Sequence, residues 1–239
     1  MLVKTIYASF QGEQNIWGIG APVIFLRTAG CHIRCYLSTY NKLCDTPSAL
    51  SLSSGSDMSF EEILEEFQKY DIKNVCLTGG DPLFSMSKTK TDIDSFFEFF
   101  IDRGYRFSVE TSGIDYYLEI ENERLRPYIS VVYDWKLSSA GIKNSDKRNV
   151  LNIPSVLNSL TDKDYIKFVV ADFIDLADYY EAIEYIRDNN KKVNICIGLY
   201  EGSERNIEYP DIIDLIKGNN ILLNFQAHKY LYSREDIDI

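Results

Sequence analysis

Residues 59–82 read SFEEILEEFQKYDIKNVCLTGGDP, and this stretch decides the fold class. Ser59, with Glu62 three residues later, forms a capping box ahead of apolar residues at helical spacing, which predicts a helix over about 60–70. The apolar run 74–77 then ends in a glycine turn, which predicts a buried strand. A helix that leads into a buried strand is typical of an α/β protein.

The same alternation extends outward in both directions. We expect further strands at 23–27, 107–109, 129–133, 166–170, 193–197 and 221–225, and further helices at 92–103, 174–188 and 210–217. The Ser-rich segment 48–56 is expected to be a loop. This order predicts a mainly parallel sheet, either open or a partial barrel.

Polar groups follow the predicted strands, and in parallel sheets the chemistry lies at the carboxyl ends of the strands. They are Gly30-Cys31, Thr78-Gly79-Gly80-Asp81, Glu110-Thr111-Ser112-Gly113, Asp134-Trp135-Lys136 and Gln226-Ala227-His228.

The composition narrows the class of protein. The chain has 239 residues, 45% of them hydrophobic, which suits one domain with a sizeable core. A net charge of -11 would repel a phosphate backbone, so we expect no nucleic-acid partner. The first residues lack the apolar run of a signal peptide, and no stretch has the roughly 18 apolar residues of a membrane span. We therefore expect a cytoplasmic protein with no membrane partner.

Three of the five cysteines, Cys31, Cys35 and Cys44, lie close together in the sequence. In a reducing compartment such a group favours metal or redox chemistry over disulfides. Three thiolates would leave one iron of a four-iron cluster open, but the spacing alone also allows a structural zinc site. Cys76 and Cys196 lie within apolar runs and are predicted to be core residues.

Two motifs distinguish between these metal sites. Gly30-Cys31-His32-Ile33-Arg34-Cys35 with Leu43-Cys44-Asp45-Thr46, followed by Thr78-Gly79-Gly80-Asp81-Pro82, resembles the cluster loop and the GGEP-type turn of the radical S-adenosylmethionine (SAM) superfamily. His32 is expected only to space this loop.

Further segments narrow the resemblance to the 7-carboxy-7-deazaguanine synthase family, over nearly the whole chain. They are Ser9-Phe10-Gln11-Gly12-Glu13, Gly20-Ala21-Pro22-Val23-Ile24-Phe25-Leu26-Arg27, Cys44-Asp45-Thr46, Glu110-Thr111-Ser112-Gly113 and Gln226-Ala227-His228-Lys229. The resemblance implies an α/β fold, a partial (β/α) barrel of radical SAM type with a mainly parallel sheet. It also implies one radical SAM core domain over 1–239, with an inserted cluster-binding loop around 31–58.

The resemblance also implies the site residues. Cys31, Cys35 and Cys44 would hold one 4Fe-4S cluster, and Thr46 would bind magnesium. The SAM-binding residues would be Leu43, Cys44, Asp45, Gly79, Gly80, Asp81, Glu110, Ser112, Asp134 and Lys136. The substrate-binding residues would be Phe10, Gln11, Gly12, Glu13, Arg27, Thr78 and His228.

By the same resemblance the enzyme would be a radical SAM lyase of queuosine and 7-deazapurine biosynthesis. It would contract the ring of 6-carboxy-5,6,7,8-tetrahydropterin to 7-carboxy-7-deazaguanine with loss of ammonia. Its partners would be this pterin substrate, an electron donor such as flavodoxin or ferredoxin, and a second copy in a homodimer. The cofactor carries the difficult chemistry, so the protein mainly orients, charges and dries the site.

The sequence departs from the family pattern in several places. Eight residues separate Cys35 from Cys44 where most members have two, and Asp81 and Ser112 replace the usual Glu and Asn. Asp-Trp-Lys at 134–136 stands where Ser-Pro-Lys is common, and the chain continues beyond His228.

Alternatives remain at this stage. A glycyl-radical activating enzyme would share the cluster and SAM but act on a protein, and a zinc-stabilised binding domain would need neither. Among single residues, Arg27 could be a surface charge, Glu13 a solvated loop acid, Thr46 a turn cap and His228 structural. Glu110 and Lys136 could form buried ion pairs instead of binding the cofactor.

Overall fold

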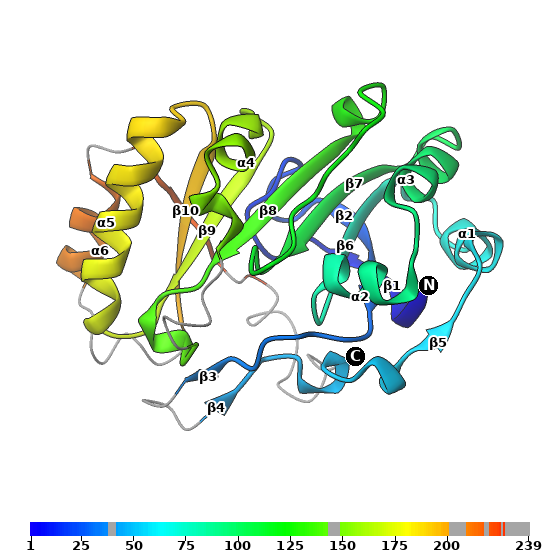
Figure 1. Cartoon of the computed structure of the whole chain (residues 1–239), viewed down its shortest axis with the longest axis horizontal. Helices are drawn as coiled ribbons and strands as arrows, with labels where there is room; N and C mark the ends of the chain where they lie inside the picture. The colour runs from blue at the N-terminus through cyan, green and yellow to red at the C-terminus, as the bar shows by residue number, and fades with distance from the viewer. Residues whose placement is uncertain (38–41, 143–148, 201–208, 218–219, 226, 228–239) are drawn as a thin grey trace.

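The computed structural model describes residues 1–37, 42–142, 149–200, 209–217, 220–225 and 227 (Figure 1). Its centre is a nine-stranded sheet in the order β11-β10-β9-β8-β7-β6-β2-β1-β5. Neighbouring strands from β2 to β11 run parallel, whereas β1 pairs antiparallel with both β2 and β5. The described strands leave the sheet open, which confirms the α/β, mainly parallel, partial-barrel prediction.

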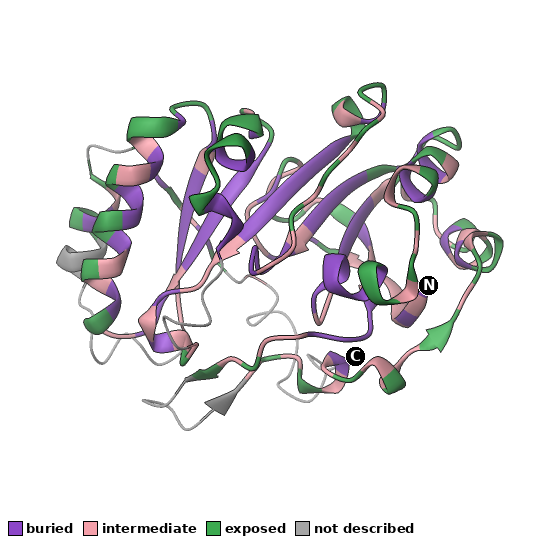
Figure 2. Cartoon of the chain, viewed as in Figure 1, coloured by how far each residue is buried: buried purple, intermediate pink, exposed green. Residues whose placement is uncertain are grey.

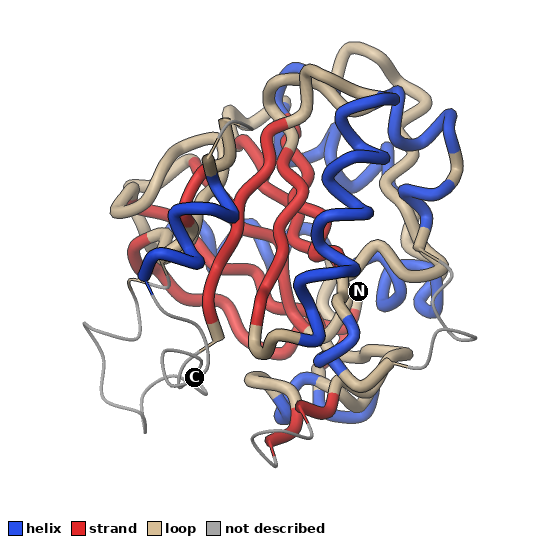
Figure 3. Tube along the Cα trace, turned by 90° about the vertical axis from the view of Figure 1, so that its left-hand side faces the viewer, coloured by secondary structure: helices blue, strands red, loops and turns tan. Residues whose placement is uncertain are grey.

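The strands of this sheet are β1 (Leu2–Phe10), β2 (Pro22–Thr28), β5 (Ser56–Asp57), β6 (Asn74–Gly79), β7 (Arg106–Thr111), β8 (Ile129–Trp135), β9 (Tyr165–Val170), β10 (Asn194–Leu199) and β11 (Leu222–Leu223). The helices are α1 (Phe60–Gln68), α2 (Pro82–Thr89), α3 (Ile93–Ile101), α4 (Pro154–Ser159), α5 (Ile174–Asn189) and α6 (Tyr209–Ile216). Figure 3 shows the strands side by side as a twisted sheet with helices beside it.

Burial explains why the central strands are short apolar runs. The interior positions of β6, β7 and β8 are buried, and the helices bury one face and expose the other (Figure 2). Strands covered on both faces need apolar side chains at successive positions instead of alternating ones. Cys76 in β6 and Cys196 in β10 are completely buried in this core, as predicted.

The decisive stretch folds as its sequence predicts. The Ser59 hydroxyl accepts a hydrogen bond from the Glu62 amide at 3.2 Å, and the Glu62 carboxylate accepts one from the Ser59 amide at 2.7 Å, so the capping box starts α1. The predicted helix at 210–217 corresponds to α6. The last predicted strand, 221–225, shortens to β11, because pairing with β10 reaches only Leu222 and Leu223.

Some elements are absent from the sequence predictions. β1 has a largely half-buried pattern without clear alternation, and α2 is a short helix that begins at Pro82 directly after the glycine turn. Pro at the first helical position after a capping Asp81 is a recognisable helix start. The loop expected at 48–56 contains two short 3-10 helices, Pro47–Ala49 and Leu52–Ser54.

The eight residues between Cys35 and Cys44 begin and end as a small antiparallel hairpin. β3 (Tyr36–Leu37) pairs with β4 (Lys42–Leu43) outside the main sheet (Figure 1). The insertion between the second and third cysteines is therefore paired at its base. Within the described part of the chain, no helix has the length and apolar character required to cross a membrane.

Candidate active site

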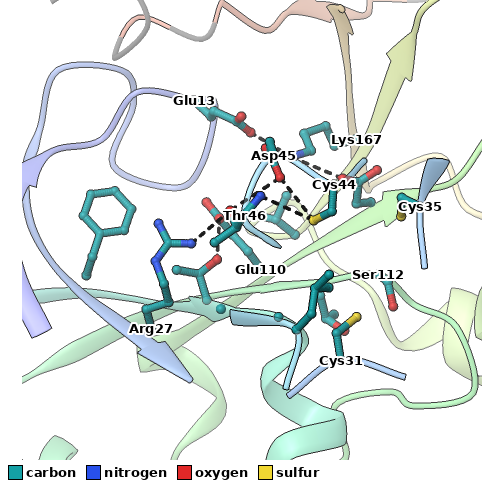
Figure 4. Close-up of a pocket in the computed structure, with 18 of the residues that line it drawn as sticks. Glu13, Arg27, Cys31, Cys35, Cys44, Asp45, Thr46, Glu110, Ser112 and Lys167 are labelled. Atoms are coloured by element: carbon teal, nitrogen blue, oxygen red, sulfur yellow. Dashed lines mark hydrogen bonds and ion pairs between the residues drawn. The ribbon is translucent and has the colours of Figure 1, made fainter. Parts of the chain in front are cut away.

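A cavity of about 450 Å³ opens where the parallel strands end. The residues that line it come from β1 and the loop after it, β2, the cysteine loop, and the ends of β6, β7 and β8, with Lys167 from β9. Figure 4 shows the sulfur atoms of Cys31, Cys35 and Cys44 on one side and the guanidinium of Arg27 on the other. Segments far apart in the sequence therefore form two facing walls of one site.

The cysteine loop is tied down by backbone hydrogen bonds. The Gly30 and Cys31 amides donate to the carbonyls of Ala49 and Leu50 at 2.8 and 3.1 Å. The Arg34 guanidinium donates to the Cys31 carbonyl at 2.6 Å, which closes the turn between the first two cysteines. The start of the loop, at Cys31, is thus held against residues 49 and 50.

Burial raises the pKa of the Cys31 thiol to about 11 and that of Cys44 to about 12, and it raises the pKa of Cys35 as well. These thiols are therefore protonated at neutral pH in the metal-free chain. Bound iron would take them as thiolates, since metal binding displaces the proton.

The donor set agrees with an iron–sulfur cluster of three protein ligands. Three soft sulfur donors line one cavity, whereas Cys76 and Cys196 lie in the core. Among the described residues no three His, Cys, Asp or Glu side chains already form a metal-binding group. The thiols would therefore have to close around the cluster as it binds.

The glycine turn packs directly against this loop. The Gly80 and Asp81 amides donate to the carbonyls of Thr28 and Gly30 at 3.3 and 2.9 Å. A Cβ at Gly80 would come within 2.4 Å of the Gly30 carbonyl oxygen, so a side chain has no room there. The turn thus presents its backbone to the cavity at Gly79 and Gly80.

Asp81 is completely buried and holds two strand ends together. Its carboxylate accepts hydrogen bonds from the Phe84 amide at the start of α2 and from the Thr111 hydroxyl. The Ser112 hydroxyl donates to it at 2.5 Å. The two positions at which this chain departs from the usual Glu and Asn of the family therefore contact each other.

The opposite wall carries Arg27 from β2. Its guanidinium donates to the Thr46 hydroxyl at 3.2 Å and to the Tyr7 hydroxyl at 3.3 Å. The Thr46 hydroxyl in turn donates to the Asp45 carboxylate at 3.4 Å. The Nε of Arg27 is buried and has no hydrogen-bond partner among the described residues, whereas each terminal nitrogen carries a second N–H that could serve a ligand in the cavity.

Two ion pairs line the floor. The Lys167 ammonium lies 2.7 Å from a Glu13 carboxylate oxygen, and the Lys136 ammonium lies 2.8 Å from the Asp134 carboxylate. Burial alone raises the pKa of Asp134, but the ammonium groups of Lys136 and Lys167 outweigh it and hold the pKa below its usual value. Asp134 is thus ionised. The sequence left open whether Lys136 forms a buried ion pair, and the structure shows that it pairs with Asp134.

Glu110 lies between the two walls (Figure 4). Its carboxyl group accepts hydrogen bonds from the Thr78 hydroxyl at 3.1 Å and from the side-chain amide of Gln11 at 3.4 Å. Burial raises the pKa of Glu110, and the neighbouring Glu13 carboxylate adds to that effect. The group is therefore easier to protonate than an ordinary glutamate.

The cavity brings together most of the residues singled out in the sequence. Its lining includes Phe10, Gln11, Glu13, Arg27, Cys31, Cys35, Cys44, Asp45, Thr46, Thr78, Gly79, Gly80, Glu110, Ser112, Asp134 and Lys136. Gly12 lies beside the lining, where its carbonyl accepts from the Ala227 amide at 2.8 Å, and Asp81 lies beneath it. Leu43 belongs to β4, and His228 lies outside the described residues.

Some lining residues were missed. Lys167 is the most informative, because a lysine within the apolar run Tyr165–Val170 was a visible signal of a paired, buried charge. Tyr7 and Phe25 stack at 5.2 Å between ring centres and form an aromatic patch near Arg27. His32 stacks on Phe84 at 5.1 Å, so it anchors the cysteine loop as well as spacing it.

Several named proteins are similar in sequence to this chain over most of its length. A 7-carboxy-7-deazaguanine synthase of Leptospira interrogans is 30% identical over 237 residues, which cover 96% of this chain and 94% of that protein. The Methanospirillum hungatei protein of the same name is 30% identical over 97% of this chain and 85% of its own length. No family model matches the chain.

Solved structures share the fold. The crystal structure of QueE from Escherichia coli superposes with a TM-score of 0.63 at 23% identity, covering 95% of this chain and 94% of that one. A structure of TYW1 with a lysine-pyruvate adduct bound gives a TM-score of 0.53 at 15% identity, covering 87% and 74%. The full-length similarity to the Leptospira protein shows that this chain belongs to the 7-carboxy-7-deazaguanine synthase family of radical SAM lyases.

Proposed function

We propose that this chain converts 6-carboxy-5,6,7,8-tetrahydropterin to 7-carboxy-7-deazaguanine and ammonia. One observation carries the proposal beyond family membership. A single cavity of about 450 Å³ has three thiols and a bare glycine turn on one side and a partly unpartnered arginine on the other. The cavity can therefore hold a cluster and its cofactor next to an anionic small molecule.

Cys31, Cys35 and Cys44 would hold the 4Fe-4S cluster, and Gly79 and Gly80 would offer backbone groups to SAM. Bound there, the cluster and SAM supply the radical chemistry that starts the rearrangement. The chain itself positions the reactants and excludes water. Asp45, Glu110, Ser112, Asp134 and Lys136 complete the proposed cofactor side, with Leu43 beside Cys44 and with Asp81 bracing the turn from below.

The proposed substrate side depends on Arg27. The planar fork of arginine suits a carboxylate, and the pterin carries one. Glu13, Gln11 and Thr78 offer hydrogen-bonding groups for the pterin ring, with Phe10 at the edge of the cavity. Gly12 supports this loop through its contact with Ala227, and His228 remains a proposed ligand outside the described residues.

A magnesium ion is part of the proposal. The Thr46 hydroxyl and the Asp45 carboxylate both line the cavity and lie 3.4 Å apart. Magnesium prefers hard oxygen donors and commonly shares them with a substrate and water. The pterin carboxylate, held by Arg27 beside Thr46, would supply a further oxygen.

The remaining parts of the proposal extend from the same assignment. The protein would act in the cytoplasm as a homodimer, receive electrons from a flavodoxin or ferredoxin, and serve queuosine biosynthesis. Residues 1–239 would form one radical SAM core domain, with the segment around 31–58 as its cluster-binding loop. The pairing of β5, which lies within that segment, with β1 of the main sheet supports treating it as part of the core.

The test is turnover by anaerobically reconstituted protein. It is incubated with dithionite, magnesium, SAM and 6-carboxytetrahydropterin, and the deazaguanine acid is detected by mass. Cys44→Ala is the inactive comparison, and Cys196→Ala, at a buried cysteine that does not line the cavity, is the matched control. A fully clustered wild type that cleaves SAM but forms no acid would refute the proposal and favour the glycyl-radical activating enzyme.

A further inference from the structure

Lys167 is a lysine inside a hydrophobic strand. It occupies β9 between Ile166 and Phe168, which are completely buried, and its own side chain is 10% exposed. An ammonium in such a position is strongly destabilising unless carboxylates compensate it. Its neighbours therefore indicate what the residue does.

Lys167 stands in the middle of a chain of alternating charges. Its ammonium lies 2.7 Å from the Glu13 carboxylate and 3.5 Å from the Asp134 carboxylate, which the Lys136 ammonium approaches at 2.8 Å. All four side chains are at most 19% exposed. This row of charged side chains runs from Glu13 in the loop after β1, across β9, to Lys136 at the end of β8.

The alternating acidic and basic side chains stabilise one another's charges. Burial opposes the ionised form of Lys167, but Glu13 and Asp134 outweigh it and raise the pKa well above the ordinary lysine value. Burial likewise opposes the charge on Lys136, and Asp134 outweighs it, so this pKa is also raised. Both lysines are therefore cationic at neutral pH.

The two ends of this chain face different parts of the cavity. Glu13 lies in the segment assigned to the pterin, and Lys136 lines the cavity among the residues assigned to SAM. Lys167 touches both carboxylates and thus spans the boundary between the substrate and cofactor sides. Lys167 lies closer to Glu13 than to Asp134, whose nearer ammonium is that of Lys136, so the larger effect of replacing Lys167 falls on Glu13.

We propose that Lys167 is a positioning residue that fixes the Glu13 carboxylate toward the substrate, so that its loss separates SAM cleavage from product formation. This inference rests on the function proposed above. Without this ammonium the Glu13 carboxylate would no longer be held in place, and the bound pterin would lose an oriented acceptor. Cofactor cleavage would continue, while hydrogen abstraction from a misplaced substrate would not.

The experiment compares reconstituted Lys167→Met with wild type and with Lys163→Met. Lys163 is an exposed lysine two residues before β9, and its ammonium donates only to the Pro127 carbonyl in the described contacts, so it controls for loss of a charge near this strand. Iron content, SAM cleavage without substrate, kcat, KM and the ratio of 5′-deoxyadenosine to deazaguanine acid are measured.

We expect Lys167→Met to bind wild-type iron and cleave SAM at a wild-type rate without substrate. Its kcat/KM should fall about 100-fold or more, because a buried carboxylate has lost its cation, and the 5′-deoxyadenosine-to-product ratio should rise. Lys163→Met should match wild type. An unchanged ratio and kcat/KM in Lys167→Met would overturn the inference while the proposed function stood, and so would loss of iron or of SAM cleavage. Absence of product from wild type would defeat the proposed function instead.

A double variant covers the case in which Lys167→Met fails to fold. Glu13→Gln with Lys167→Met removes the carboxylate together with the ammonium that faces it, so it should fold and lose no more activity than Glu13→Gln alone. Losses that multiply in the double variant would show that the two residues act independently and would overturn the inference.

Discussion

The two walls of the cavity are built by different kinds of interaction. The cysteine wall is held by backbone hydrogen bonds among Gly30, Ala49 and Asp81, with glycines where the segments touch. The opposite wall is held by charged side chains, namely the Lys167–Glu13 ion pair and Arg27 with its hydrogen bonds to Tyr7 and Thr46. A wall of close backbone contacts has no space for extra atoms, whereas a wall of ion pairs tolerates changes of shape better than changes of charge.

This contrast fits the two tasks of the site. A cluster with its cofactor needs three sulfur atoms and exposed backbone groups at fixed positions, which closely packed segments supply. A heterocycle with a carboxylate needs oriented charges and hydrogen-bonding groups, which Arg27 and Glu13 supply. We therefore expect substitutions in the cysteine wall and in the opposite wall to have different effects.

The largest effect is expected from the cysteines. Cys44→Ala, like Cys31→Ala or Cys35→Ala, should abolish cluster assembly and all SAM cleavage, because two thiolates remain for a cluster that needs three. Iron analysis and the absorption near 400 nm after reconstitution check this. An unchanged iron content in Cys44→Ala would contradict the assignment, and Cys196→Ala should assemble the cluster normally.

The next effect tests the packing of the glycine turn. Gly79→Ala places a Cβ 2.3 Å from the Thr28 carbonyl oxygen at a φ of +143°, whereas Gly104→Ala has a φ of +83° and nothing within 4 Å. The positive φ costs about 1–2 kcal/mol in Gly104→Ala and about 1–3 kcal/mol in Gly79→Ala, and overpacking adds about 1–3 kcal/mol in Gly79→Ala alone. Chemical denaturation measures the difference, and equal losses would show that the turn can move.

The third prediction concerns the charged wall. Arg27→Lys should lose nearly as much kcat/KM as Arg27→Ala, because an ammonium cannot make the two parallel hydrogen bonds of a guanidinium. A lost charged hydrogen bond is worth about 1.5–3 kcal/mol, so we expect a fall of about 10- to 100-fold. The cluster and substrate-free SAM cleavage should survive. Arg124→Lys, at an exposed ion pair with Glu98, is the control. Full activity in Arg27→Lys would refute bidentate binding.

The smallest effect is on stability. The raised pKa of Glu110 means that the folded state binds its proton more tightly than the unfolded state, so stability falls as the pH rises above the ordinary value of 4.5. Glu110→Gln should therefore raise Tm at pH 7, and this gain should disappear below that value. Exposed Glu123→Gln should not change Tm. A lower Tm for Glu110→Gln at pH 7 would show that the ionised Glu110 side chain does not destabilise the folded protein.

The elements that the sequence predicts best are those encoded within one segment. The capping box of α1, the glycine turn after β6 and the position of Cys76 in the core depend on neighbouring residues, and the structure has all of them. Short or one-sided elements were harder to predict. β1 and α2 lack a clear period, because one is half-buried at most positions and the other spans only Pro82–Thr89.

The sequence by itself determined the donor groups, namely three clustered cysteines, the bare glycine turn, and the acids and the arginine placed at strand ends. Only the tertiary structure decided how they pair. Glu13 meets Lys167 across 154 positions of the chain, and Asp81 meets Ser112 across 31. Those contacts follow from the order of strands in the sheet. Local periodicity cannot encode that order, because it arises when distant apolar faces pack together.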